Sequence, residues 1–163
     1  QANQFGLTKS MKLAGLLLFI TDIHSVGLPA AQGLYLTTPW YWNQNAQSRA
    51  WAERYFKEMH AMPTFLQAGD YSATMTYLKA VKAAGTTDGA KVMAELHKTK
   101  VNDMYMKDGT LRASGLMIHD MYLEQVKTPA ESKEPWDYYK LVQTIPGNDA
   151  FGPASAYGCP LDK

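Results

Sequence analysis

The feature that most restricts the fold is the apolar run KLAGLLLFI at Lys12–Ile20, which is followed directly by Thr21 and Asp22. A run of this length bounded by polar residues is typical of a strand that is buried on both faces of a parallel sheet. Threonine and aspartate are residues that cap helices, and Ser25 is a second candidate for that position. The sequence therefore predicts a strand that leads straight into a helix.

The rest of the chain extends this pattern and then changes in character. We predict a short helix over Pro29–Gln32, a strand over Leu34–Thr37, and helices over Asn45–His60, over Asp70 or Ser72 to Ala84, and over Thr87–Lys98. We then predict strands over Met104–Met106 and Thr110–Arg112, a half-exposed strand over Ile118–Val126 paired with Trp136–Thr144, and irregular chain over Pro146–Lys163. This order predicts an α/β fold with a parallel sheet and additional antiparallel strands.

Composition excludes several classes of protein. With 163 residues, of which 46% are hydrophobic and 19% charged, the chain is long enough and apolar enough to form a packed core. Its 16 basic and 15 acidic residues give a net charge of +1, so we expect no nucleic acid as a partner. The apolar run is too short to span a bilayer, and the opening residues do not have the pattern of a signal peptide.

Three stretches together resemble one protein family. LAGLLLFITDIHSVGLPAAQGLYLT (13–37) is similar to a strand–loop–helix–strand unit in the second lobe of type I periplasmic binding proteins. The matching branch is the branched-chain amino acid (Leu/Ile/Val)-binding family of ABC transporters. AGDYSATMTYLKAVKAAGT (68–86) resembles the helix that returns to the first lobe, and DGTLRASGLMIHDMYLEQVK (108–127) resembles the late hairpin and crossover strand.

The resemblance implies a Rossmann-like parallel sheet with flanking helices in an incomplete two-lobed fold. Residues 1–62 would form part of the second lobe, 63–117 would return to the first lobe, and 118–163 would supply the crossover strand, hairpin and tail. Family members are more than twice as long, and Gln1–Leu7 reads like the end of a helix, so we expect a C-terminal portion. Such a portion would expose sheet edges, which favours a homo-oligomer or a strand-exchanged dimer. Cys159, the single cysteine, is either a small half-buried residue or the partner of a cysteine elsewhere.

Candidate ligand-binding residues lie where strands of the expected sheet end, because ligands of open α/β sheets bind outside the carboxyl ends of the strands. They are Thr21, Asp22, Ile23, His24 and Ser25 after the first strand and Tyr41 after the second. The resemblance also implies that Asp70 and Tyr71, at the start of the returning helix, lie near the cleft. Each has a structural alternative: Asp22 and Asp70 as helix caps, His24 as a surface histidine, and the tyrosines as packing residues.

The resemblance implies a periplasmic solute-binding component of an ABC transporter that binds an amino acid or an aromatic carboxylate and docks on a permease. We expect no cofactor and no metal, since His24, His60, His97 and His119 are dispersed along the chain. The alternative is a small α/β hydrolase that uses Asp22 and His24. Those two residues point in different directions on any regular element, and Ser25 lacks a nucleophile elbow, so we expect a binding protein rather than an enzyme.

Overall fold

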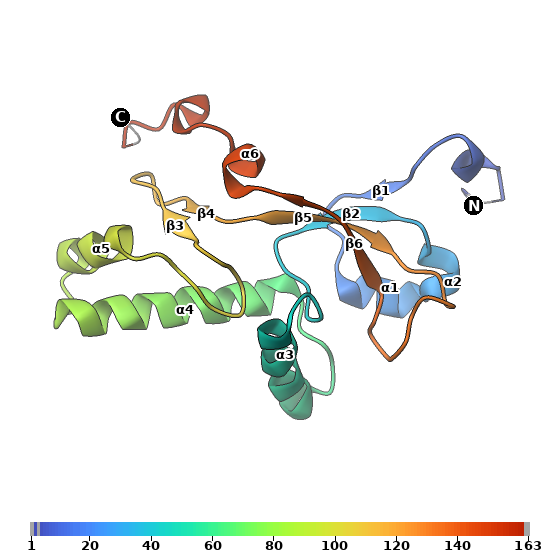
Figure 1. Cartoon of the computed structure of the whole chain (residues 1–163), viewed down its shortest axis with the longest axis horizontal. Coiled ribbons are helices and arrows are strands. Elements are labelled where there is room, and N and C mark those ends of the chain that lie inside the picture. Colours follow the sequence, from blue (N-terminus) through green and yellow to red (C-terminus); the bar gives the residue numbers. More distant parts are fainter. Residues whose placement is uncertain (1, 3, 162–163) are drawn as a thin grey trace.

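The computed structural model describes residues 2 and 4–161 of the chain (Figure 1). The elements that form the sheet and the helices next to it are β1 (Ala14–Gly15), α1 (Ile20–Val26), α2 (Leu28–Ala31), β2 (Tyr35–Thr38), α3 (Ala46–Met59), β5 (Met121–Val126) and β6 (Tyr139–Ile145). The others are η1 (Leu7–Lys9), α4 (Phe65–Ala84), α5 (Gly89–Lys98), β3 (Thr110–Leu111), β4 (Met117–Ile118), α6 (Gly147–Phe151) and η2 (Ala154–Tyr157).

The main sheet of the described residues is mixed and has the strand order β1–β2–β5–β6. Strands β1 and β2 are parallel, β2 and β5 are antiparallel, and β5 and β6 are antiparallel. The predicted α/β class is therefore confirmed, but the antiparallel strands belong to the same sheet as the parallel pair. Helices α1, α2 and α3 lie on one side of this sheet (Figure 1).

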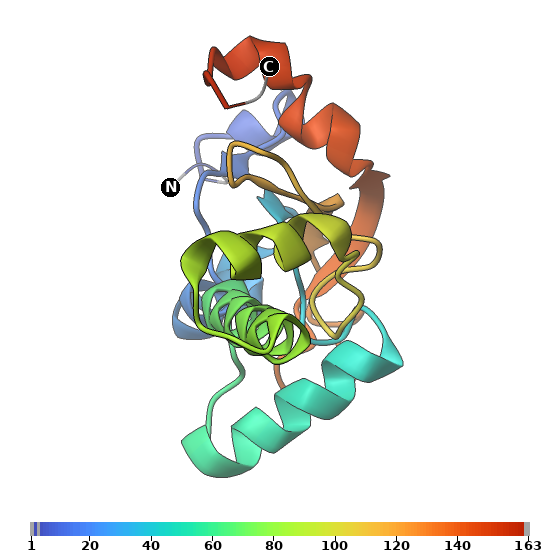
Figure 2. The ribbon, with the colours of Figure 1, turned by 90° about the vertical axis from the view of Figure 1, so that its left-hand side faces the viewer.

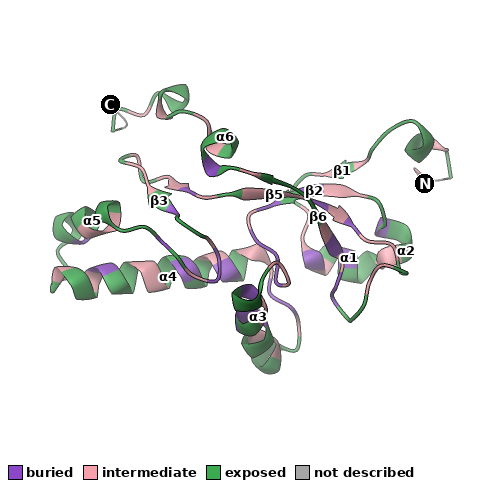
Figure 3. Cartoon of the chain, viewed as in Figure 1, coloured by how far each residue is buried: buried purple, intermediate pink, exposed green. Residues whose placement is uncertain are grey.

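A second group of elements lies beyond the end of the sheet. Helix α4 packs against α5, and the short hairpin β3–β4 contacts α5 and α6 (Figure 2). The outward faces of α4 and α5 are largely exposed (Figure 3), and the exposed apolar side chains there include Leu66, Tyr77, Leu78 and Met93. These helices therefore bury only part of their apolar surface within the described chain.

Local sequence signals account for several helices. Asn45 caps α3 by accepting a hydrogen bond from the Ser48 N–H at 2.9 Å, and the helix ends at His60 in a left-handed conformation. Asp88 caps α5 in the same way, through the Lys91 N–H. The predictions for these two helices, for β2 and for the β5–β6 pairing are confirmed to within a few residues.

The prediction of a long buried strand over Lys12–Ile20 is wrong. Only Ala14–Gly15 forms a strand, and Leu16 and Leu17 are 95% and 75% exposed. Leu17 has a φ of 54°, which turns the chain out of the extended conformation. Asp22 does not occupy the N-cap of α1 but its third position, from which its carboxylate accepts a hydrogen bond from the Phe19 N–H at 2.8 Å. Four residues, 16–19, therefore connect β1 to α1.

Three further predictions need correction. Helix α4 begins at Phe65 rather than near Asp70, because Thr64 and Gln67 form a capping box at its start. Strand β3 pairs with β4, across the turn that contains Gly115, and not with residues 104–106. Pro146–Lys163, which was expected to be irregular, contains α6 and η2. In the segment Gln1–Leu7, residues Gln1 and Asn3 lie outside the described residues.

Candidate functional site

The carboxyl ends of the two parallel strands meet at one edge of the sheet. Gly15 ends β1 and Thr38 ends β2, and the connections that follow are residues 16–19 and 39–45. In an open α/β sheet this edge is where ligands bind, because strand ends and helix N-termini surround an unfilled space there. The candidate site is therefore built from these two connections and from whatever element lies beside them.

The connection from β1 to α1 divides its apolar residues between the core and the surface. Leu18 faces inward, where it lines a small internal space together with Thr38 and Phe65. The Phe19 ring stacks on the Phe65 ring with a centroid separation of 5.2 Å. Leu16 and Leu17 are left exposed beside this contact. Two adjacent leucines are thus exposed on a turn that the contact between Phe19 and Phe65 anchors.

The start of α4 lies next to this edge. Phe65 is its first residue, and Tyr71 follows in its second turn, 40% exposed, with its ring 5.4 Å from the buried ring of Trp51. Asp70, beside it, is exposed. Both predicted residues thus stand on the helix surface after its first turn, with Tyr71 fixed on one side by Trp51.

The five residues Thr21–Ser25, predicted as a binding loop, lie within α1. Ile23 is buried in the core, Asp22 caps the helix start, and the Ser25 hydroxyl donates a hydrogen bond to the Thr21 carbonyl at 2.9 Å. Three of these side chains are therefore engaged by the helix or the core. Asp22, His24 and Ser25 are exposed all the same, and the loop that precedes α1 carries the exposed Leu16 and Leu17.

His24 connects α1 to the segment between β5 and β6. Its ring stacks on Trp136 at a centroid separation of 3.8 Å and an interplanar angle of 7°. Its Nδ1 and the Tyr138 hydroxyl share a hydrogen bond of 2.7 Å. Such a ring, held on one face and at one nitrogen, fixes the position of α1 against the sheet.

Tyr41 is buried, and backbone groups surround its hydroxyl. The hydroxyl donates to the Trp136 carbonyl at 3.0 Å and accepts from the N–H groups of Tyr138 and Tyr139 at 2.9 and 3.4 Å. Burial raises the pKa of the Tyr41 hydroxyl well above its usual value, although these backbone hydrogen bonds oppose the shift. The side chain thereby joins the connection after β2 to the start of β6.

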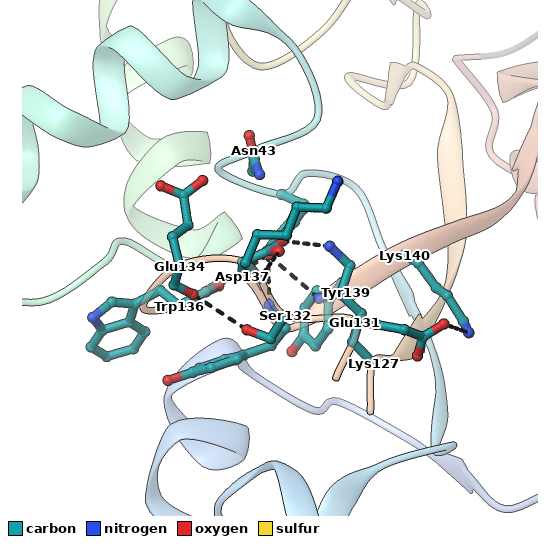
Figure 4. A network of polar contacts seen from close by, with 12 residues as sticks. Asn43, Lys127, Glu131, Ser132, Glu134, Trp136, Asp137, Tyr139 and Lys140 are labelled. Atoms are coloured by element: carbon teal, nitrogen blue, oxygen red, sulfur yellow. Dashed lines mark hydrogen bonds and ion pairs between the residues drawn. The ribbon is translucent and has the colours of Figure 1, made fainter. Parts of the chain in front are cut away.

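A polar network holds the β5–β6 connection against the loop before α3 (Figure 4). Lys127 donates to Asp137 at 2.6 Å, and the Lys133 N–H donates to the same carboxylate at 3.0 Å. Desolvation acts to raise the pKa of Asp137, but these hydrogen bonds outweigh it and the pKa is lowered. The Arg49 guanidinium binds Glu134 from α3, which lowers the pKa of that carboxyl as well. The network orders the connection that carries Trp136 and Tyr138.

Sequence reasoning missed Leu16, Leu17 and the network around Asp137. The available signal for the leucines was Asp22. An aspartate can be the N-cap of a helix itself, or it can stand at the third helical position and accept a hydrogen bond from the backbone N–H of the N-cap residue three positions earlier. Among the described residues, no group of histidine, cysteine, aspartate and glutamate is arranged to hold a metal ion. None of the helices in that part of the chain is long and apolar enough to cross a membrane.

Comparison with known proteins identifies the family. The family model described as periplasmic binding protein matches residues 1–133. A periplasmic binding protein from Burkholderia mallei is 59% identical, with a TM-score of 0.91 over 99% of this chain and 43% of its own. A branched-chain amino acid ABC transporter periplasmic ligand-binding protein from Burkholderia xenovorans LB400 is 45% identical, with a TM-score of 0.95 over 100% of this chain and 44% of its own. No curated protein matches the sequence.

A third structure shares the fold at low identity. The solute-binding protein of an ABC transporter from Rhodopseudomonas palustris BisB5, in complex with 3,4-dihydroxybenzoic acid, is 20% identical, with a TM-score of 0.73 over 90% of this chain and 40% of its own. The chain thus spans less than half the length of each of these structures. They are binding proteins rather than enzymes, which goes against the hydrolase alternative based on Asp22 and His24. With its family model covering residues 1–133 and two relatives 59% and 45% identical over nearly its whole length, the chain belongs to the periplasmic binding protein family.

Proposed function

We propose that this chain is the C-terminal portion of a periplasmic solute-binding protein of an ABC transporter and that it supplies one wall of the ligand cleft. The chain covers 43% of the length of its relative from Burkholderia mallei, which supports the first part of the proposal. The observation that carries the second is the exposure of Leu16 and Leu17 at the carboxyl end of β1. A turn that presents two leucines at the ligand edge of an α/β sheet suits an apolar side chain of a ligand.

The ligand class that we infer is a small amino acid or an aromatic carboxylate. Leu16 and Leu17 would contact its apolar part, and Tyr71, whose ring is braced by Trp51, would face it from α4. Thr21, Asp22, Ile23, His24, Ser25, Tyr41 and Asp70 would support this wall, with Asp22 and His24 fixing α1 and Tyr41 fixing the second connection. The name of the relative from Burkholderia xenovorans, a branched-chain amino acid transporter protein, supports the amino acid class. The complex with 3,4-dihydroxybenzoic acid indicates that the fold is compatible with an aromatic carboxylate.

The partner that we infer is the permease of the transporter. In this family of two-lobed receptors the ligand selects the closed arrangement of the lobes. A permease can distinguish this closed arrangement from the free protein. Its place of action would be the periplasm.

Replacing Leu16 with aspartate in the two-lobed protein is expected to weaken ligand binding at least tenfold, or about 1.4 kcal/mol, because the carboxylate must be desolvated against an apolar ligand. Titration calorimetry with L-leucine, L-valine, L-phenylalanine, benzoate and 3,4-dihydroxybenzoate measures the effect. Val26→Asp is the matched control, since Val26 is 63% exposed at the opposite end of α1. Equal affinities of the two variants would contradict the assignment of this edge, and no binding by the unaltered protein would contradict the ligand class.

We also infer that the 163-residue chain by itself self-associates. Strand β6 is at the edge of the sheet, and Leu141 and Val142 on it are 57% and 48% exposed. An edge strand with exposed apolar residues pairs readily with another chain. Sedimentation velocity is expected to show a dimer or larger species at micromolar concentration, whereas a stable monomer would refute the inference.

A further inference from the structure

A cavity of about 240 Å³ lies between β5, β6 and the loop that precedes α3. Its walls are part polar and part apolar, and the polar side chains in them include Glu124, Lys127, Asp137 and Tyr139. None of the leucines at the candidate cleft wall lines it, and neither does Tyr71. The cavity therefore does not include the exposed leucines or Tyr71 of the proposed ligand wall, although Tyr41, which supports that wall, lines it as well.

Two of the residues that line this cavity each carry a buried polar atom that has no hydrogen-bond partner among the described residues. Glu124 is 2% exposed and Tyr139 is 5% exposed, and both line the cavity. Among the residues that the structure describes, neither the Glu124 Oε2 nor the Tyr139 hydroxyl has a hydrogen-bond partner. Leaving a buried polar group unpaired is costly, and a charged group more so, which is why nearly all such groups in native proteins are satisfied. A carboxylate and a hydroxyl that share a polar cavity suit a ligand that donates at least two hydrogen bonds.

The charges around the cavity determine the sign of that ligand. The only cation in its walls, Lys127, is bound to Asp137 at 2.6 Å, so these two charges neutralise each other. Glu124, on the neighbouring strand β5, has no such ion pair within the described residues. An ionised Glu124 therefore leaves one uncompensated negative charge, and the complementary ligand is a cation with N–H donors.

The amides on the opposite wall favour a ligand that also carries an oxygen. The Gln44 side-chain oxygen accepts from the Tyr41 N–H at 3.0 Å, and the Asn45 side-chain oxygen accepts from the Ser48 N–H at 2.9 Å. Each oxygen is thus held by a backbone N–H, and the NH2 groups of these two cavity-lining side chains can serve a ligand as donors. A hydroxyl group can accept from them.

We propose that this cavity binds a small hydroxylated primary amine in its ammonium form, with the ammonium group donating to Glu124 and Tyr139. Ethanolammonium is the simplest such compound. It is small enough for the volume, and it combines two donors for the buried oxygens with a hydroxyl for the amides. A quaternary ammonium such as choline has no N–H to donate, and ethylene glycol has the same shape without the charge.

Binding should depend on pH through Glu124. Burial raises the pKa of Glu124 to about 7, with Lys127 opposing the shift. Burial raises the pKa values of Tyr41, Tyr122 and Tyr139 in the cavity walls, and the pKa of Asp137 is lowered, so none of these four groups titrates between pH 5.5 and 8. Ammonium binding needs the ionised Glu124, so the affinity rises as the pH rises through about 7.

The test is an NMR titration of the 15N-labelled protein with ethanolammonium chloride in phosphate buffer at pH 8. The expected result is saturable shifts of the Glu124 and Tyr139 amides, and no saturable shifts with ethylene glycol or choline. Glu124→Gln is expected to weaken binding at least tenfold and to remove its pH dependence, because it replaces a charged acceptor with a neutral one. Tyr139→Phe should weaken it about tenfold, because the hydroxyl accepts a charge-assisted hydrogen bond from the ammonium group.

Glu131→Gln is the matched control. Glu131 is a carboxylate on the same β5–β6 connection, but it binds Lys140 and does not line the cavity, so its variant should bind like the unaltered protein. Equal saturation by ethylene glycol, or an unchanged affinity in Glu124→Gln, would overturn the proposal in favour of simple hydration of the two atoms. Saturation by potassium ions with no response to ethanolammonium would also overturn it. Tyr139→Phe and the pH series still test the site should Glu124→Gln fail to fold.

Discussion

Replacing Trp42 with alanine is expected to lower the free energy of unfolding by about 3–5 kcal/mol, the usual cost of truncating a fully buried tryptophan. Trp42 is 1% exposed, and its indole N–H donates to the Trp136 carbonyl at 2.9 Å. The Arg49 guanidinium lies 4.7 Å above its ring. The substitution therefore removes core volume, the hydrogen bond that ties the loop before α3 to the β5–β6 connection, and the contact with Arg49 on α3.

Urea denaturation followed by circular dichroism measures this loss. Tyr77→Ala is the control, since Tyr77 is an aromatic residue that is 48% exposed on α4, and its truncation should cost under about 1 kcal/mol. Trp42→Phe separates the two causes, because it keeps most of the volume and loses the hydrogen bond, at a cost of about 1 kcal/mol. A Trp42→Ala variant no less stable than Tyr77→Ala would show that this tryptophan does not anchor the core.

Replacing Glu124 with glutamine is expected to change how stability depends on pH. Burial raises the pKa of Glu124 from 4.5 to about 7. Between these values the folded protein holds a proton that the unfolded chain has released, so stability falls as the pH rises from about 4.5 to about 7 and stays lower above it. For a shift of this size the loss is about 3 kcal/mol. The glutamine variant should lack it, so that its stability relative to the unaltered protein increases by about 2.5 kcal/mol between pH 5 and pH 8.

Denaturation at the two pH values, in phosphate or acetate rather than an amine buffer, measures this difference. Amine-free conditions matter because a cation bound at Glu124 would favour the ionised form and reduce the effect. Glu131→Gln provides the opposite case. Hydrogen bonds from Lys140 and Thr128 lower the pKa of Glu131 to about 2. The contribution of the ionised Glu131 to stability is therefore complete above pH 4.5 and is lost only as the pH falls through about 2. An equal pH trend in the two variants would contradict the assignment to Glu124.

Short-range signals predicted the elements with clear caps. Asn45 and Asp88 stand one residue before the helices that they cap, and the hydrogen bonds of those caps are local, so the sequence is sufficient to locate them. The same reasoning misplaced the start of α4, because Thr64 and Gln67 form an equally local capping box that was not considered. It also misassigned residues 12–20, since a run of leucines is equally compatible with a buried strand and with an exposed turn.

The candidate site at the carboxyl end of the first strand stays a prediction. Its expected place follows from the α/β pattern. The sequence reasoning placed Thr21–Ser25 at that end, whereas the structure has Leu16 and Leu17 there and Thr21–Ser25 inside α1. This difference of a few residues depends on where β1 ends. The end of β1 is decided by its pairing with β2 rather than by the apolar run over residues 12–20 itself.

The sequence by itself determined the α/β class, the family resemblance, the capped helices and the pairing of the last two strands. These follow from patterns whose period and spacing are set within a single element. Only the tertiary structure decided that Leu16 and Leu17 are exposed, that His24 and Tyr41 hold elements together, and that Glu124 is buried. Burial and charge depend on neighbours that are distant in the chain: Glu124 pairs with Leu36 in β2 and lies under the loop before α3, contacts that no local pattern encodes.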